Sequence, residues 1–207
     1  MLESGPMSST YPSPAASAEI EIEVKKSRFI ARAARVTDRQ AALALVEQAK
    51  RDYSDARHVC WAYLLGNPAS ASSAATNDAG EPSGTAGRPI LNVIQHKGVG
   101  DVLVVVIRYF GGIKLGAGGL VRAYSGAAEA VMSMLPLEQA VAVQEVKLRL
   151  DFAAEQLLRH WAGQHEAQIL NVEYAEQVVV QLSVPESAMD ELAAFCAAHG
   201  ITLTDAP

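Results

Sequence analysis

Two glycine-rich segments carry the side chains of this sequence whose types and spacing could do chemistry. Residues 78–89 place carboxylates, hydroxyls and one guanidinium among three glycines, and residues 108–125 place cations among five. Eleven of the fifteen glycines of the chain lie between positions 80 and 126. Because glycine loses much backbone entropy when it is ordered, such density predicts turns with positive φ, or a backbone that approaches a ligand or a partner closely.

The second segment predicts an anion-binding loop. It connects an apolar strand to a helix, with Lys114 in the loop and Arg122 in the first turns of the helix. Glycine N–H groups, the positive end of the helix dipole and two cations together favour phosphate. The Gly-Lys-Ser/Thr sequence of a P-loop is absent, and the glycine spacing does not match the dinucleotide-binding fingerprint. The alternative is a tight connection that needs its glycines only for packing.

In the first segment, Asp78 and Glu81 are three residues apart and could hold Mg²⁺ or act as acid and base. No third ligand follows, and local hydrogen bonds to the backbone account for the same residue types, so a network that organises the loop is favoured. The sequence predicts no catalytic residue, no cofactor and no metal site. The predicted surface for an anion, a nucleic acid or a partner consists of Asp78, Gly80, Glu81, Ser83, Gly84, Thr85, Arg88, Arg108, Gly111, Gly112, Lys114, Gly116, Gly118, Gly119 and Arg122.

His58 and Cys60 lie two apart on a predicted strand, so both project from one face and suggest a cysteine nucleophile with its base. Cysteine is often a small core residue, and a histidine on a strand often bonds to backbone. A structural role for both residues is therefore the favoured interpretation.

Charge divides the chain. The formal net charge is -6, but residues 1–135 carry 14 Lys and Arg against 12 Asp and Glu, whereas residues 136–207 carry 3 against 11. This break predicts a boundary between a first domain over 19–136 and an acidic domain over 137–207. The Ser, Ala and Pro content of residues 1–18 predicts a disordered tail before the first domain. A basic stretch in the first domain could extend a phosphate-binding stripe; it consists of Lys25, Lys26, Arg28, Arg32, Arg35 and Arg39.

The chain has two cysteines, no stretch of signal-peptide character and no apolar run long enough to cross a bilayer. We therefore expect a cytoplasmic protein with reduced thiols and no membrane partner.

Periodicity predicts the elements that must position these residues. In the first domain we expect a hairpin over 19–36, a strand over 58–65 and a central buried strand over 101–109. The expected helices cover 38–50, opened by a Thr37–Gln40 capping box, a segment from Pro89, and 120–135. A mobile loop is expected over 66–77. The last third has the order strand, helix, strand, strand, helix, strand. This βαββαβ order is that of a ferredoxin-like split repeat.

The two glycine-rich segments, together with residues 26–30 and 58–66, closely resemble the IMPACT family in its bacterial YigZ branch. The resemblance implies an α+β protein with a first domain like domain 2 of ribosomal protein S5, followed by the ferredoxin-like domain. It implies no established catalytic residue. It places nine of the predicted surface residues on the signature positions of the family: Asp78, Gly80, Glu81, Ser83, Gly84, Arg88, Arg108, Lys114 and Arg122.

Eukaryotic members of this family are translational regulators that bind a ribosome-associated activator of the amino-acid-starvation kinase. The sequence contains no stretch resembling their amino-terminal RWD domain, so we do not expect their partner to carry over. The resemblance implies a translation-associated regulatory binding protein, which docks RNA, the ribosome or ribosome-associated factors through a glycine-rich basic surface. The alternatives are an enzyme acting on a nucleotide or phosphorylated metabolite, and a pure protein-interaction module.

Overall fold

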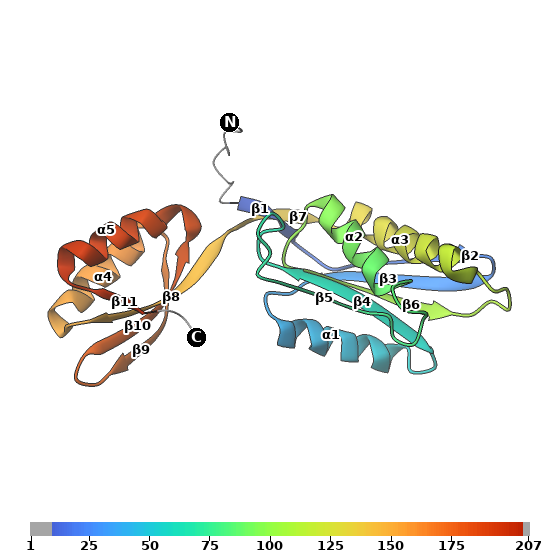
Figure 1. Ribbon diagram of the computed structural model, residues 1–207, viewed down its shortest axis with the longest axis horizontal. Coiled ribbons are helices and arrows are strands. Elements are labelled where there is room, and N and C mark those ends of the chain that lie inside the picture. Colours follow the sequence, from blue (N-terminus) through green and yellow to red (C-terminus); the bar gives the residue numbers. More distant parts are fainter. Residues whose placement is uncertain (1–9, 205–207) are drawn as a thin grey trace, which may run out of the picture. The chain divides into compact units, whose positions relative to one another are not determined.

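The computed structural model describes residues 10–204. They divide into two compact units, residues 10–140 and residues 141–204, each with its own sheet and helices (Figure 1). The division falls after Ala140, five residues beyond the change in charge that the sequence shows. Both units mix helices with antiparallel strands, which is the predicted α+β class.

The first unit is built on a five-stranded antiparallel sheet with the order β2-β3-β6-β4-β5. Its strands are β2 (Ala18–Val24), β3 (Ser27–Arg35), β4 (His58–Leu65), β5 (Ser73–Asn77) and β6 (Val102–Tyr109). The apolar residues of β6 are buried on both faces, as their unbroken run of Val, Leu and Ile predicted. β6 is the central strand.

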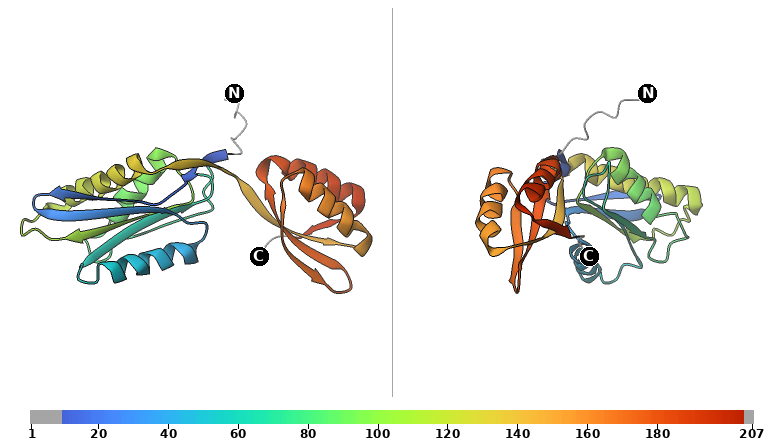
Figure 2. Two further views of the ribbon diagram at one scale, coloured as in Figure 1. Left: turned by 180° about the vertical axis from the view of Figure 1, so that it is seen from behind. Right: turned by 60° about the vertical axis from the view of Figure 1, so that its left-hand side comes forward.

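Three helices cover the two faces of this sheet (Figure 2). α1 (Arg39–Asp52) packs on one face, and α2 (Gly87–Lys97) and α3 (Gly116–Met134) pack on the other. Alternate residues of β6 therefore enter different cores: Val104 meets α2 and α3, and Leu103 meets the α1 side. The predicted capping box of α1 was wrong, because Asp38 is the N-cap and its carboxylate accepts the Ala41 N–H at 2.8 Å.

Two segments expected to lack structure form edge strands instead. Residues 73–77, placed in a mobile loop by their Ser and Ala content, form β5 beside β4. Of the expected tail, residues 1–9 lie outside the described part of the chain, but β1 (Thr10–Pro14) pairs with β7 (Leu137–Val141). The Tyr11 hydroxyl donates to the buried Asp101 carboxylate at 2.7 Å, so a distant contact holds a segment whose own composition predicts no strand.

The second unit has a four-stranded antiparallel sheet with the order β11-β8-β10-β9, which is the ferredoxin-like arrangement that the sequence predicted. Its elements are β8 (Val143–Leu150), α4 (Phe152–Gln164), β9 (Gln168–Tyr174), β10 (Val178–Pro185), a short 3-10 turn η1 (Glu186–Ala188), α5 (Met189–His199) and β11 (Thr202–Thr204). α4 and α5 supply Leu158 and Leu192 to its core. Among residues 10–204, no helix is long and apolar enough to span a membrane.

Candidate functional site

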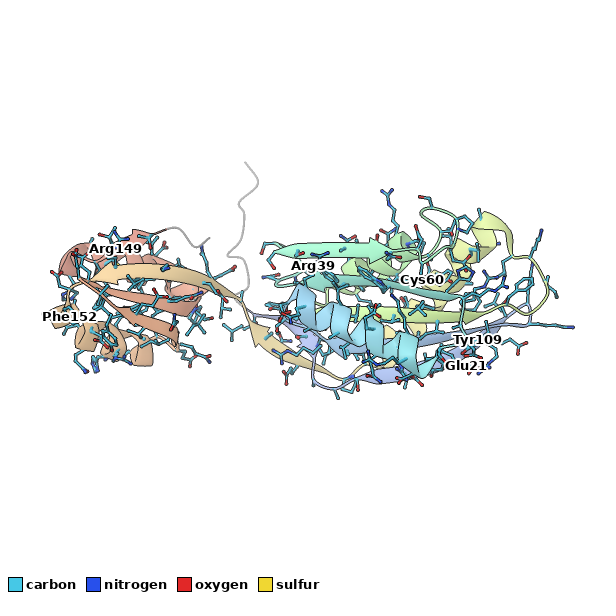
Figure 3. All side chains as sticks on the ribbon, turned by 90° about the horizontal axis from the view of Figure 1, so that it is seen from below. Glu21, Arg39, Cys60, Tyr109, Arg149 and Phe152 are labelled. Atoms are coloured by element: carbon cyan, nitrogen blue, oxygen red, sulfur yellow. The ribbon has the colours of Figure 1, made fainter. Side chains whose placement is uncertain are left out.

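Several of the residues singled out by the sequence lie at one end of the first-unit sheet. His58, at the start of β4, lies opposite Arg108 in the register of β4 with β6, and Arg28 of β3 lies opposite Tyr109. The turn between β2 and β3, the start of β4 and the loop that follows β6 therefore share this end, where Figure 3 labels Tyr109 and Glu21.

A buried ion pair joins the first glycine-rich segment to the sheet. Arg108 Nη1 lies 2.6 Å from Glu81 Oε1, and the side chains are only 8% and 4% exposed. The hydroxyl of Tyr124, on α3, donates to the same carboxylate oxygen at 2.8 Å. Glu81 thus ties its loop to β6 and to α3, which fits the predicted role of an organising network and occupies the carboxylate that could have done acid–base chemistry.

His58 and Cys60 hold the backbone of the same loop. The His58 Nδ1 lies 2.9 Å from the Ala79 carbonyl oxygen, and the Cys60 thiol donates to the Asp78 carbonyl at 3.0 Å. Burial raises the pKa of the Cys60 thiol to about 12, so the thiol is protonated at neutral pH. The contacts of both residues with the loop backbone agree with the structural role that the sequence favoured.

Asp78 caps α2 from nine residues away. Its carboxylate accepts three backbone N–H groups, from Gly84 at 2.7 Å, Ala86 at 3.0 Å and Gly87 at 2.8 Å. The residue at the N-cap position, Ala86, has no side-chain oxygen with which to cap the helix. Burial alone would raise the pKa of the Asp78 carboxyl, but the three N–H groups together lower it below its ordinary value.

The second glycine-rich segment packs closely against the turn between β2 and β3. The Gly111 N–H donates to Ser27 Oγ at 3.1 Å, and a Cβ at Gly111 would lie 2.0 Å from the carbonyl of Lys26. Gly112 and Gly116 have positive φ. α3 begins at Gly116, so Gly116, Gly118 and Gly119 belong to the helix and not to the loop expected before residue 120. Packing therefore explains part of the glycine pattern.

Replacing Gly111 by alanine should lower the free energy of unfolding by about 1–3 kcal/mol, because the new methyl group would overlap backbone atoms that have no room to move. Gly118 is the matched control: it lies within α3, and an added Cβ would meet nothing nearer than an arginine nitrogen at 3.9 Å. Gly118→Ala should stabilise the protein slightly. Urea unfolding of both variants measures the difference, and equal effects would contradict this packing.

Four exposed cations lie on the turn between β2 and β3, in the loop after β6 and on α3. Lys25 and Lys26 form the turn that contacts Gly111, Lys114 lies in the loop, and Arg122 projects from α3. Lys25 and Arg122 share a pocket of about 300 Å³ with Gly119 of α3. None of the four cations has an ion pair with any residue between 10 and 204.

Other predicted residues are placed differently. Arg88 is exposed on the first turn of α2, and no contact brings it to the four cations. Thr85 is buried and donates to the Pro82 carbonyl at 2.6 Å, while Ser83 is exposed. The expected basic stripe along β3 is neutralised by ion pairs: Arg28 with Glu21, Arg32 with Glu19 and Asp52, and Arg35 with Glu138.

Sequence reasoning missed Tyr124, the hydroxyl that links α3 to Glu81. Tyr124 lies on the apolar face of its helix among alanines, and a buried tyrosine hydroxyl needs a hydrogen-bond partner. This requirement indicates that the Tyr124 hydroxyl has a hydrogen-bond partner, but the sequence does not show that the partner is Glu81. Within the described chain, no group of three or more His, Cys, Asp or Glu side chains is arranged to hold a metal ion.

Comparison with known proteins agrees with this domain structure. The model of the Impact N-terminal domain matches residues 25–132, and a domain of unknown function, DUF1949, matches residues 148–198. The chain belongs to the IMPACT family. The buried pair of Glu81 and Arg108, the cap Asp78 and the four exposed cations all lie within the matched Impact N-terminal domain.

Two relatives with this family name match over most of their length. The IMPACT family member YigZ of Escherichia coli (strain K12) is 36% identical over 181 residues, which cover 87% of this chain and 89% of YigZ. An IMPACT family member of Haemophilus influenzae is 33% identical over 180 residues, covering 87% of each chain. A crystal structure described as that of a hypothetical protein is 33% identical, with a TM-score of 0.76, and covers 97% of this chain and 99% of its own.

Proposed function

We propose that the first unit is a binding module through which this protein docks onto RNA, the ribosome or ribosome-associated factors and regulates translation. One observation carries the proposal: at this end of the sheet the carboxylates of Asp78 and Glu81 are used in internal contacts, while the four cations stay exposed. A surface of this kind attracts phosphate oxygens.

The start of α3 adds to this attraction. Its N-cap residue, Leu115, provides no side-chain hydrogen bond to the first N–H groups, and Lys114 and Arg122 flank them. The positive end of a helix dipole favours anions, and the two cations act in the same direction. The second unit repels phosphate, because residues 141–204 carry only 3 Lys and Arg against 9 Asp and Glu. Its charge discourages loose association with arbitrary nucleic acid.

The role in translation is supported by the IMPACT family, whose eukaryotic members regulate translation. The enzyme alternative has no comparable support, because the two carboxylates assigned to it are the anchors of the loop. A protein-interaction module would use the same surface, so the binding experiments below are needed to distinguish it from RNA docking.

Binding should weaken steeply with salt and should depend on the exposed cations. Sedimentation of the protein with ribosomes, and fluorescence anisotropy with a structured RNA, measure the affinity across a salt series. Lys114→Ala/Arg122→Ala should reduce affinity by about tenfold or more at low salt and make the dependence of log K on log salt shallower by about two. Each substitution removes one cation that would bind a phosphate oxygen, and this explains both changes.

The matched control is Lys50→Ala/Arg51→Ala, which removes two exposed cations of α1 on the other face of the sheet. It should leave affinity and salt dependence close to those of the unaltered protein. Absence of binding to RNA and to ribosomes at low salt would end the nucleic-acid proposal. Ribosome binding that survives in the cation variant would point to a protein partner.

A further inference from the structure

A pocket of about 450 Å³ lies at the same end of the first-unit sheet. It is lined by Asp55, Arg57, His58, Arg108, Tyr109 and Phe110. Two cross-strand neighbours, His58 and Arg108, form part of its wall. Its volume falls within the range of pockets that hold small ligands.

Phe110 is exposed but held in place. Its side chain is 58% exposed, although it directly follows the buried central strand. The next residue, Gly111, is fixed by its N–H bond to Ser27 Oγ and by its close contact with Lys26. The Arg108 guanidinium lies 5.7 Å from the centre of the Phe110 ring. An aromatic ring kept at the surface in this way is a preorganised platform for stacking.

The formal charges in and beside the pocket are balanced. The charge of Arg108 is offset by Glu81 at 2.6 Å, and Asp55, which accepts the Tyr109 hydroxyl at 2.7 Å, offsets that of Arg57. A free phosphate would therefore gain little from entering the pocket. A flat, neutral and polar ring fits this lining better, since aromatic faces and hydrogen-bonding groups are both present.

The pocket also offers hydrogen bonds of both kinds. Since the Ala79 carbonyl can only accept, the His58 Nδ1 must carry the proton of their contact, and Nε2 of the neutral ring is an acceptor. Arg57 is exposed and supplies N–H donors. The edge of a nucleobase carries donors and acceptors that match such a set.

We propose that this pocket receives one unpaired base of a single-stranded RNA segment, stacked on Phe110, while the neighbouring phosphates lie on the exposed cations. The inference rests on the proposed function and specifies it further. Gly111 connects the two features, because it follows Phe110 directly and contacts Lys26 of the cationic turn. The first unit would then bind a base as well as phosphate groups. Because the bases of a duplex are stacked and paired, this binding mode favours unpaired RNA.

Fluorescence anisotropy with two labelled strands of about ten nucleotides tests the proposal on the full chain at low salt. One strand is oligouridylate, and the other is an abasic ribose-phosphate strand of equal length and charge. The unaltered protein should bind oligouridylate about tenfold or more tightly than the abasic strand, because only the former can stack. Phe110→Leu should abolish this preference without weakening the abasic strand, and Phe110→Trp should retain it.

Phe152 is the matched control residue, since its side chain is 57% exposed and it belongs to the second unit. Phe152→Leu should keep the preference, and thermal unfolding confirms that each variant is folded. Three results would overturn the base pocket and leave phosphate docking standing. The unaltered protein could bind both strands equally, the preference could survive Phe110→Leu, or the preference could be lost in Phe152→Leu. Failure of both strands to bind overturns the base pocket, and the assays with structured RNA and ribosomes then decide whether RNA docking stands.

Discussion

Replacing Glu81 by alanine should lower the free energy of unfolding by about 3–5 kcal/mol, because it leaves the Arg108 guanidinium buried without its counter-charge. Arg108 Nε already has no hydrogen-bond partner among residues 10–204, so the guanidinium depends strongly on Glu81. The Tyr124 hydroxyl loses its acceptor in the same variant. Equilibrium unfolding in urea, followed by circular dichroism, gives the difference.

Two further variants separate the charge effect from simple loss of packing. Glu81→Leu/Arg108→Met removes both charges and should be more stable than Glu81→Ala, since no buried charge is left alone. Glu21→Ala breaks the exposed pair with Arg28 and should change stability little, because solvent screens that pair. If Glu81→Ala were no more harmful than Glu21→Ala, the buried pair would not be an anchor of the loop.

Replacing Asp78 by alanine should lower the free energy of unfolding by about 2–4 kcal/mol at neutral pH, because three N–H groups lose a charged acceptor at the start of α2. The effect should depend on pH in a defined direction. The fold lowers the pKa of the Asp78 carboxyl, so its contribution is complete above the pKa of about 3.9 in the unfolded chain and disappears as pH falls through the lower pKa of the folded state. The difference between the two proteins should therefore shrink below about pH 4.

Asp38→Ala is the matched control for this prediction. Asp38 caps α1 through one backbone N–H at 2.8 Å, whereas Asp78 accepts three. The control should therefore lose less stability, about 1 kcal/mol. A loss at Asp78 no larger than that at Asp38, or a loss that does not change in acid, would contradict the capping role assigned to Asp78.

The elements with a strong local pattern were predictable, and the edge strands were not. The central strand β6 is indicated by its unbroken apolar run, and the ferredoxin-like order follows from alternating periods along residues 141–204. β1 and β5 have short, Ser-, Pro- or Ala-containing sequences with no apolar period of their own. They exist because neighbouring strands and distant side chains, such as Asp101 for Tyr11, hold them.

For the site, the sequence by itself determined which segments matter, because glycine density and paired charges are local features that need no partner to be recognised. It also determined the family, through long strings of residues in those segments. Only the tertiary structure decided which charged groups stay open. Glu81 meets Arg108 across 27 positions and Arg35 meets Glu138 across 103, whereas Lys114 and Arg122 meet no carboxylate in the described chain. Whether a charge is neutralised depends on distances of a few ångströms between residues far apart in sequence, and those distances are set by how the strands and helices pack.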